Sequence, residues 1–201
     1  MKQFKIIKRF WPLALFLTLA GCFTIENGPI LSSGDLVEGL VGEKGGFVQD
    51  SLGNDPSYID AADRVIYEFH RALNGSYIVE TPEADEYVML SAVLIAEDVF
   101  VGDAVSEPGE SSPFMLMVDR TSIIPIFHFC ISVDLGNEAM AAIAAEYGME
   151  ISQGSYGSTT LRPETPEQYI GFMTGLWNAS EPNDWECTAM RDQEFEPVKK
   201  D

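Results

Sequence analysis

The chain has 201 residues, of which 32 are Asp or Glu and only 12 are Lys or Arg, so its formal net charge is −20 at pH 7. This acid excess argues against a nucleic-acid-binding protein, which needs a basic surface to contact phosphates. The protein surface is equally unsuited to lie on an anionic membrane. The simplest interpretation of the acid excess is that it keeps the protein soluble through mutual repulsion; the alternative is that it forms a binding surface for cations or for a basic partner.

The N-terminal residues have the pattern of an export signal. Four cations and no acid lie within the first nine residues, and an apolar stretch follows over residues 10–20. As a helix this stretch would reach about 16 Å, which is too short to span a bilayer. A basic start, a short apolar core and small residues at the end are typical of a secretory signal peptide. We therefore expect residues 1–21 to be a signal peptide that is removed.

The signal ends in Leu19-Ala20-Gly21-Cys22, which resembles the lipobox of bacterial lipoproteins. The resemblance implies that the thiol of Cys22 receives a diacylglycerol, that the leader is cut before it, and that acyl chains such as palmitate anchor the protein to a membrane. Two or more chains hold a protein firmly, whereas one does so only marginally. Phe23 follows, where an Asp would imply retention in the inner membrane, so the family analogy implies the outer membrane, facing the periplasm. The alternative is an ordinary signal peptide and a free thiol.

Downstream of the leader we expect a tether and one domain. Residues 22–34 contain Gly, Pro and Ser in the pattern of a flexible linker, and residues 35–201 carry the apolar content of a single periplasmic domain. The mature chain has a formal charge of −24, because the leader holds four of the 12 basic residues and none of the 32 acidic ones.

The first part of this domain has strand patterns, and one of them predicts a hairpin. Asn74-Gly75 marks a turn between two alternating segments. A three-residue loop over 73–75 would place Phe69 opposite Val79, whereas a two-residue loop would mismatch Phe69 with Glu80. We prefer the first, with Gly75 in a left-handed conformation. Strands are expected over residues 45–50, 64–70, 77–79, 87–94, 99–105, 114–118 and 123–133, with a loop over 106–112.

The strand over residues 123–133 separates two kinds of side chain. The residues expected to face the core are Phe127, Phe129, Ile131 and Val133. Cys130 lies on the other face together with His128 and Ser132. If Cys22 carries lipid, Cys130 and Cys187 remain as an even pair in an oxidising compartment. We expect them to form a disulfide; the alternative is two separate buried thiols.

The C-terminal part has helical periodicity. Two apolar stripes at i, i+3, i+4 and i+7 predict two helices, one ended by Gly148 and one begun by Thr165 as N-cap with Pro166 next. Short strands are expected over residues 149–151 and 158–161, and a last strand over 185–190. The stripes consist of Met140, Ile143, Ala144 and Tyr147, and of Tyr169, Phe172, Met173 and Leu176.

These elements predict an α+β fold, a β-dominated antiparallel sheet or partial barrel followed by two packed helices. A small up-and-down barrel is the alternative. The mature domain loosely resembles small uncharacterised lipoproteins of proteobacteria, a resemblance that implies no activity.

The sequence contains no motif that identifies a catalytic, cofactor-binding or metal site. His128 and Cys130 share a strand face and His70 could approach them, but the chain has only two His, and a metal site usually needs three or four clustered ligands. Four acids in one loop do not have the spacing of a calcium loop; they are Asp50, Asp55, Asp60 and Asp63. Neither Glu83 with Glu86 nor Gly154-Ser155-Tyr156-Gly157 matches a catalytic pattern.

We therefore expect a membrane-anchored lipoprotein of the cell envelope that acts as a non-catalytic binding or interaction module. It would use no cofactor, bind no nucleic acid, and contact another envelope protein. The alternative is a lipocalin-like carrier of a small molecule or lipid, with a pocket that Met115 and Met117 could line. An enzyme would need convergent acids with strongly shifted pKa values.

Overall fold

The computed structural model describes residues 23–26, 28–31, 44–49, 65–73, 75–80, 87–107, 110–121, 126–153 and 159–192. These residues form an α+β fold in which a large, mostly antiparallel sheet is combined with two helices. The strands are β1 Phe23–Glu26, β2 Lys44–Gln49, β3 Val65–Arg71, β4 Tyr77–Glu80, β5 Tyr87–Ala96, β6 Val99–Glu107, β7 Glu110–Asp119, β8 Ile126–Val133, β9 Glu150–Gln153, β10 Thr159–Arg162 and β11 Trp185–Asp192. The helices are α2 Asn137–Glu146 and α3 Pro166–Ala179, and a short 3-10 turn, η4, covers Pro182–Asp184.

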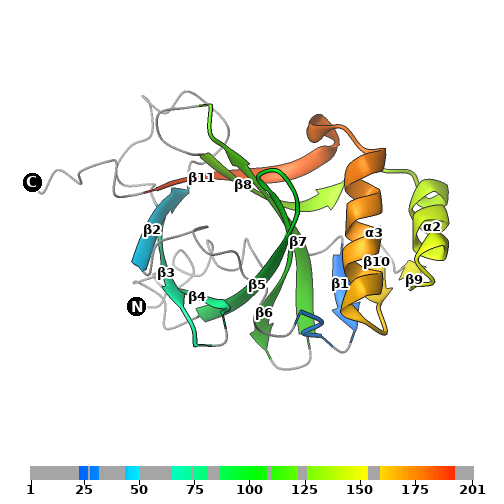
Figure 1. The fold of residues 1–201 in the computed structure, drawn as a ribbon, viewed down its shortest axis with the longest axis horizontal. Helices are drawn as coiled ribbons and strands as arrows, with labels where there is room; N and C mark the ends of the chain where they lie inside the picture. Colours follow the sequence, from blue (N-terminus) through cyan, green and yellow to red (C-terminus); the bar gives the residue numbers. More distant parts are fainter. Residues whose placement is uncertain are drawn as a thin grey trace, which may run out of the picture.

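Most of the sheet curls on itself (Figure 1). The strand order is β6-β5-β4-β3-β2-β11-β8-β7-β1-β10-β9, and β6 pairs with β7 as well. The strands β2 to β8 together with β11 are therefore hydrogen-bonded neighbours all the way round, and we call these eight strands the ring. The strands β1, β10 and β9 extend from β7 and form what we call the wing, whose last strand, β9, leaves the sheet as a whole open.

The ring is built mainly from strands that follow one another in the chain. The β3–β4 hairpin has the predicted register, with Phe69 opposite Val79 and Arg71 opposite Tyr77. The amide of Ala72 donates to the carbonyl of Ser76 at 2.7 Å, and Gly75 has the predicted positive φ of 86°. The three-residue loop is therefore confirmed.

Apolar side chains fill both faces of the sheet. Residues that point to the inside of the ring form one cluster, the inner cluster, which includes Phe114 and Phe129 with ring centroids 5.4 Å apart. Residues on the outer face of β6, β7 and β8 form a second cluster with the wing and the two helices, the outer cluster. In Figure 1 both helices lie beside the wing, outside the ring.

A bulge in β8 changes the predicted assignment of its side chains. The register with β11 passes from Cys130 opposite Cys187 to Ser132 opposite Glu186, so Ile131 has no partner in β11. An extra residue in one strand reverses the side-chain alternation beyond it. Phe127 and Phe129 belong to the inner cluster as predicted, whereas Val133 belongs to the outer cluster with Cys130. The single core face expected over residues 127–133 is thus wrong beyond residue 130.

The two helices begin, end and bury their side chains as their sequences predict. The hydroxyl of Thr165 accepts a hydrogen bond from the amide of Gln168 at 3.3 Å, and Pro166 is the first helical residue of α3. Gly148 follows α2 with a positive φ of 65°. The side chains buried in α3 are Tyr169, Phe172, Met173 and Leu176, and those buried in α2 are Met140 and Ala144.

Two predictions about loops are wrong where the structure describes them. Residues 23–26 and 28–31, which we expected in a tether over 22–34, belong to the fold: β1 pairs with β7 on one edge and with β10 on the other. Residues 106–112 do not form one loop, because β6 continues to Glu107 and β7 resumes at Glu110. Both strands extend into polar sequence because their backbone pairing does not depend on apolar side chains.

Candidate functional site

The predicted disulfide joins the ring's last strand to its neighbour. Cys130 of β8 and Cys187 of β11 lie directly opposite one another, with Cα atoms 3.9 Å apart and sulfur atoms bonded at 2.04 Å. The bond links residues 57 positions apart. The pairing that the sequence predicted is confirmed, and it rules out two separate thiols.

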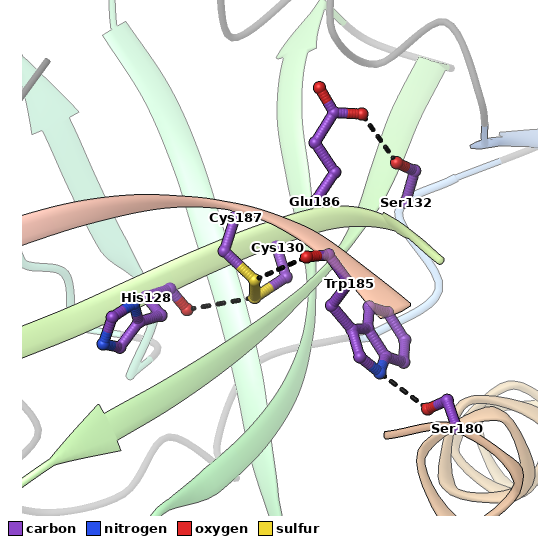
Figure 2. Close-up of a disulfide and its surroundings, with 7 residues drawn as sticks. All are labelled: His128, Cys130, Ser132, Ser180, Trp185, Glu186 and Cys187. Carbon is purple, nitrogen blue, oxygen red and sulfur yellow. Dashed lines mark hydrogen bonds between the residues drawn. A yellow bond between two sulfur atoms is a disulfide. The ribbon is translucent and has the colours of Figure 1, made fainter. Parts of the chain in front are cut away.

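The surroundings of the disulfide are well packed (Figure 2). Each sulfur lies 3.6 Å from the carbonyl oxygen two residues earlier in its own strand, in His128 and in Trp185; a bonded sulfur has no hydrogen to donate, so these are contacts only. The indole Nε1 of Trp185 donates to the hydroxyl of Ser180 at 2.7 Å, which connects β11 to the end of α3.

The candidate metal ligands do not come together. Cys130 is oxidised in the disulfide and offers no thiolate. Nε2 of His70 on β3 lies 3.9 Å from a carboxylate oxygen of Glu80 on the neighbouring strand β4, and the strands β2 and β11 lie between β3 and β8, which carries His128. Within the part of the chain that the structure describes, no three His, Cys, Asp or Glu side chains are grouped as a metal site requires.

Several residues singled out in the sequence lie outside the described residues. They are Cys22, the acids Asp50, Asp55, Asp60 and Asp63, the pair Glu83 and Glu86, and the segment Gly154-Ser155-Tyr156-Gly157. Predictions that concern them stay predictions.

Met115 and Met117 are described, and they lie in the outer cluster beneath the helices. Alternation along β7 points both side chains away from the inside of the ring, and the expectation that they line a ligand pocket stays a prediction.

The structure reveals a buried polar site at the base of the wing that the sequence analysis missed. Asp103 lies in the middle of β6, and its side chain is fully buried. Its Oδ2 atom accepts hydrogen bonds from the backbone amides of Ile30, at 2.7 Å, and Leu31, at 3.1 Å. Its Oδ1 atom is buried and has no hydrogen-bond partner among the described residues. The carboxylate thus binds the segment that follows β1.

The same segment fits closely against β7. A Cβ atom added to Gly28 would lie 2.0 Å from Oγ of Ser111, so only glycine allows this approach. The hydroxyl of Ser111 is itself buried and, within the part of the chain that the structure describes, has no hydrogen-bond partner. Ser111 also pairs with Ile25 of β1. Residues 25–26 and 28–31 are therefore held along β6 and β7 by strand pairing, by close contact and by the Asp103 carboxylate.

Burial sets the electrostatics of this site. Desolvation raises the pKa of Asp103 from 3.8 to about 6, although the hydrogen bonds from Leu31 and Ile30 oppose this rise. Tyr169 of α3 donates its hydroxyl to the carbonyl of Gly102, next to Asp103. Burial raises the pKa of Tyr169, and the Asp103 charge raises it further. The hydrogen bond of Tyr169 to Gly102 joins α3 to β6 beside the buried Asp103.

Chemically, this arrangement is suited to holding the chain's own backbone. The fully buried carboxylate of Asp103 cannot contact a dissolved substrate. Both hydrogen bonds that its Oδ2 atom accepts come from backbone amides of the protein itself. The site therefore acts as a clamp on residues 28–31, which we call the clamp segment.

Two sequence signals could have pointed to this site. Phe23-Thr-Ile-Glu26 alternates apolar and polar residues with β-branched side chains, which is the pattern of a short half-buried strand. Asp103 interrupts an otherwise small and apolar strand, Val99 to Val105, and a charged residue there calls for a partner. Neither signal identifies Ile30 and Leu31 as that partner.

Comparison with known proteins finds no match: no family model, no curated protein and no solved structure is significantly similar to this chain. Among the described residues, no helix has the length and apolar character needed to cross a membrane.

Proposed function

We propose that the protein is a lipid-anchored lipoprotein of the bacterial envelope, acylated at Cys22 and exposed to the periplasm from the outer membrane, and that its domain is a non-catalytic interaction module for another envelope protein. The observation that carries this proposal is the lipobox-like Leu19-Ala20-Gly21-Cys22 at the end of an export signal. The disulfide Cys130–Cys187 supports it, because disulfides persist in oxidising compartments such as the periplasm.

The buried clamp supports a non-catalytic domain. The described buried groups with shifted pKa values, Asp103 and Tyr169, contact the protein itself and not an open cleft. Catalytic acids and bases must reach a substrate within hydrogen-bond distance. The perturbed groups thus serve the attachment of the N-terminal segment.

Intact mass spectrometry of the protein from its own host tests the anchor. We expect the mass of residues 22–201 plus acyl groups, and release from membranes only with detergent. Replacing Cys22 with Ser should abolish both properties. The matched control is the double replacement of Cys130 and Cys187 by Ala, which removes the other two cysteines and should leave acylation intact. An unprocessed mass for the wild-type protein would refute the proposal.

Cross-linking in the native envelope tests the interaction module. We expect one or a few protein neighbours to be captured reproducibly with wild-type protein and lost with Cys22→Ser, which cannot stay at the membrane. Capture of the same neighbours by both forms would mean that the anchor does not position the domain for its partner.

The ring of strands favours a second candidate, a lipocalin-like carrier. Eight hydrogen-bonded strands enclose the apolar inner cluster, and a ring of this size either fills with side chains or holds one small ligand. Native mass spectrometry of the gently extracted protein distinguishes the two, because a carrier should retain a stoichiometric lipid or small molecule. Substitution of inner-cluster Phe100 should then alter ligand retention, whereas substitution of exposed Glu138 should not.

A further inference from the structure

The position of the proposed anchor relative to the fold is set by one peptide bond. Consecutive Cα atoms are 3.8 Å apart, so Cys22 lies within that distance of Phe23. Phe23 is the first residue of β1, is only 5% exposed and pairs with Thr159 of β10. A lipid on Cys22 is therefore attached to the folded body with no intervening spacer.

The segment that follows cannot extend as a tether without losing specific interactions. β1 is paired on both edges, and its Phe23 and Ile25 side chains belong to the outer cluster. Next in the chain, the clamp segment packs its Gly28 against Ser111 and binds the buried Asp103. Freeing the chain would expose two buried apolar side chains and leave a buried carboxylate without its donors.

The strand directions show which part of the body lies beside the anchor. β10 runs parallel to β1, from Thr159 next to Phe23 to Arg162, which forms an ion pair with Glu26. α3 begins at Pro166, a few residues after this far end, so it runs back towards the start of β1, as Figure 1 shows. Its 14 residues rise about 21 Å, which is more than the length of the four-residue β1, so its last turn lies beyond the start of β1 on the anchored side (Figure 1).

The anchored end is therefore made of the first residues of β1 and β10, the last turn of α3, and the start of β11. Trp185 begins β11 and belongs to the same cluster as Phe23. The indole of Trp185 donates a hydrogen bond to the hydroxyl of Ser180, just after α3. Trp177, in the last turn of α3, therefore lies close to Trp185. We call this group of elements the proximal end.

We propose that the proximal end faces the lipid headgroups at short range, so that the domain is held in a fixed orientation on the bilayer and does not swing on a flexible tether. This proposal rests on the proposed acylation of Cys22. The acyl chains and not the protein surface hold this end at the headgroups, because the mature chain has a formal charge of −24 and the proximal end itself carries Glu181, Asp184 and Glu186.

The chain contains its own probes for this geometry. After removal of the leader, Trp177 and Trp185 are the only tryptophans, and both belong to the proximal end. Energy transfer from them to a dansyl-labelled phosphatidylethanolamine reports their distance from the headgroups. The acylated protein is reconstituted in phosphatidylethanolamine and phosphatidylglycerol vesicles that contain this lipid.

We expect strong transfer for the wild-type protein. A 12-residue Gly/Ser insertion between Cys22 and Phe23 adds a flexible spacer with a root-mean-square length of about 20 Å, and transfer should fall by about twofold or more. The matched control carries the same insertion after Leu73, at the exposed tip of the β3–β4 hairpin, and should transfer like the wild type.

The outcomes separate this proposal from the proposed function. Intact mass is measured first, and a protein without acyl groups refutes the anchor itself. If the protein is acylated but the wild type transfers weakly, the proximal end does not face the headgroups and the proposal is wrong. If transfer is strong and the spacer leaves it unchanged, the surface and not the short connection holds the domain, which also overturns the proposal.

Discussion

The ring and the wing of this protein differ in how their strands meet. In the ring, each strand from β2 to β7 pairs with the next strand in the chain, and only β11 arrives from a distance. In the wing, β1 pairs in parallel with β10, so that Thr24 and Thr160 form a hydrogen bond across 136 positions. The ring is therefore specified by local alternation and turns, whereas the wing needs contacts between the two ends of the chain.

The two regions also use different stabilising interactions. The ring encloses aromatic and aliphatic side chains, and a covalent bond fixes its distant strand. The wing packs its apolar face under α3, and the segment that follows β1 is bound through its backbone amides by the buried carboxylate of Asp103 on the ring strand β6. The following predictions test this contrast, beginning with the largest expected effect.

Removal of the disulfide should weaken the ring most. Closing a loop between residues 57 positions apart restricts the unfolded chain, and its loss should lower the free energy of unfolding by about 4 kcal/mol in the chain-entropy description. The variant Cys130→Ala with Cys187→Ala is compared with Cys22→Ala by urea unfolding, followed through tryptophan fluorescence. A loss below about 1 kcal/mol would mean that strand pairing alone fixes β11.

The clamp should make the wing's stability depend on pH. Burial raises the pKa of Asp103 to about 6, so between about pH 4 and pH 6 the folded protein binds a proton that the unfolded chain has released. The contribution is fully present below the unfolded pKa and is lost as pH rises through 6, a change of about 3 kcal/mol. Asp103→Asn should match the wild type at pH 4 and exceed its unfolding free energy at pH 8.

Asp119 provides the control with the opposite sign. The hydrogen bond from the Thr121 hydroxyl lowers the pKa of this exposed carboxyl, so its contribution is present at neutral pH and is lost on acidification. Asp119→Asn should therefore be less stable than the wild type at pH 7 and approach it at low pH. If Asp103→Asn behaved in the same way, the assignment of Asp103 as a destabilised buried charge would be wrong.

A methyl group at residue 28 should displace the clamp segment. The added Cβ of Gly28→Ala would meet Oγ of Ser111 at 2.0 Å, and such overpacking typically costs about 1–3 kcal/mol. Adding Ser111→Gly removes the opposing atoms and should recover part of this loss in thermal unfolding. The control Gly136→Ala places its methyl group in open space and should have little effect. If the double variant recovered no stability, the methyl group at residue 28 would be in conflict with atoms other than those of the Ser111 side chain.

The smallest effect is expected at the start of α3. Thr165→Ala removes the hydroxyl that accepts from the amide of Gln168, which should lower the free energy of unfolding by about 1 kcal/mol. Thr165→Ser keeps the acceptor and should stay within a few tenths of the wild type. Equal losses in both variants would indicate that the methyl group of Thr165, and not its hydroxyl, stabilises the start of α3.

Local signals in the chain were sufficient to predict most of its strands and both helices. Alternation predicted most ring strands, the loop at Asn74-Gly75 fixed the register of β3 with β4, and the two helices followed from apolar stripes and caps. The disulfide partners were also accessible, since Cys130 and Cys187 were the only pair left once Cys22 was set aside. The strand, turn and helix signals each act within a few residues, and the disulfide involved a choice between only two remaining cysteines.

Tertiary structure alone decided the bulge at Ile131, the incorporation of β1 and the role of Asp103. β8 leaves the edge of β7 after Cys130, and β1 occupies the same edge from Ile25 onward, an exchange that neither segment encodes separately. Asp103 binds amides more than seventy positions earlier in the chain. These partners depend on which polar groups still lack a hydrogen bond when distant strands pack together. The free-energy cost of burying a polar group without a partner arises only once the fold has formed.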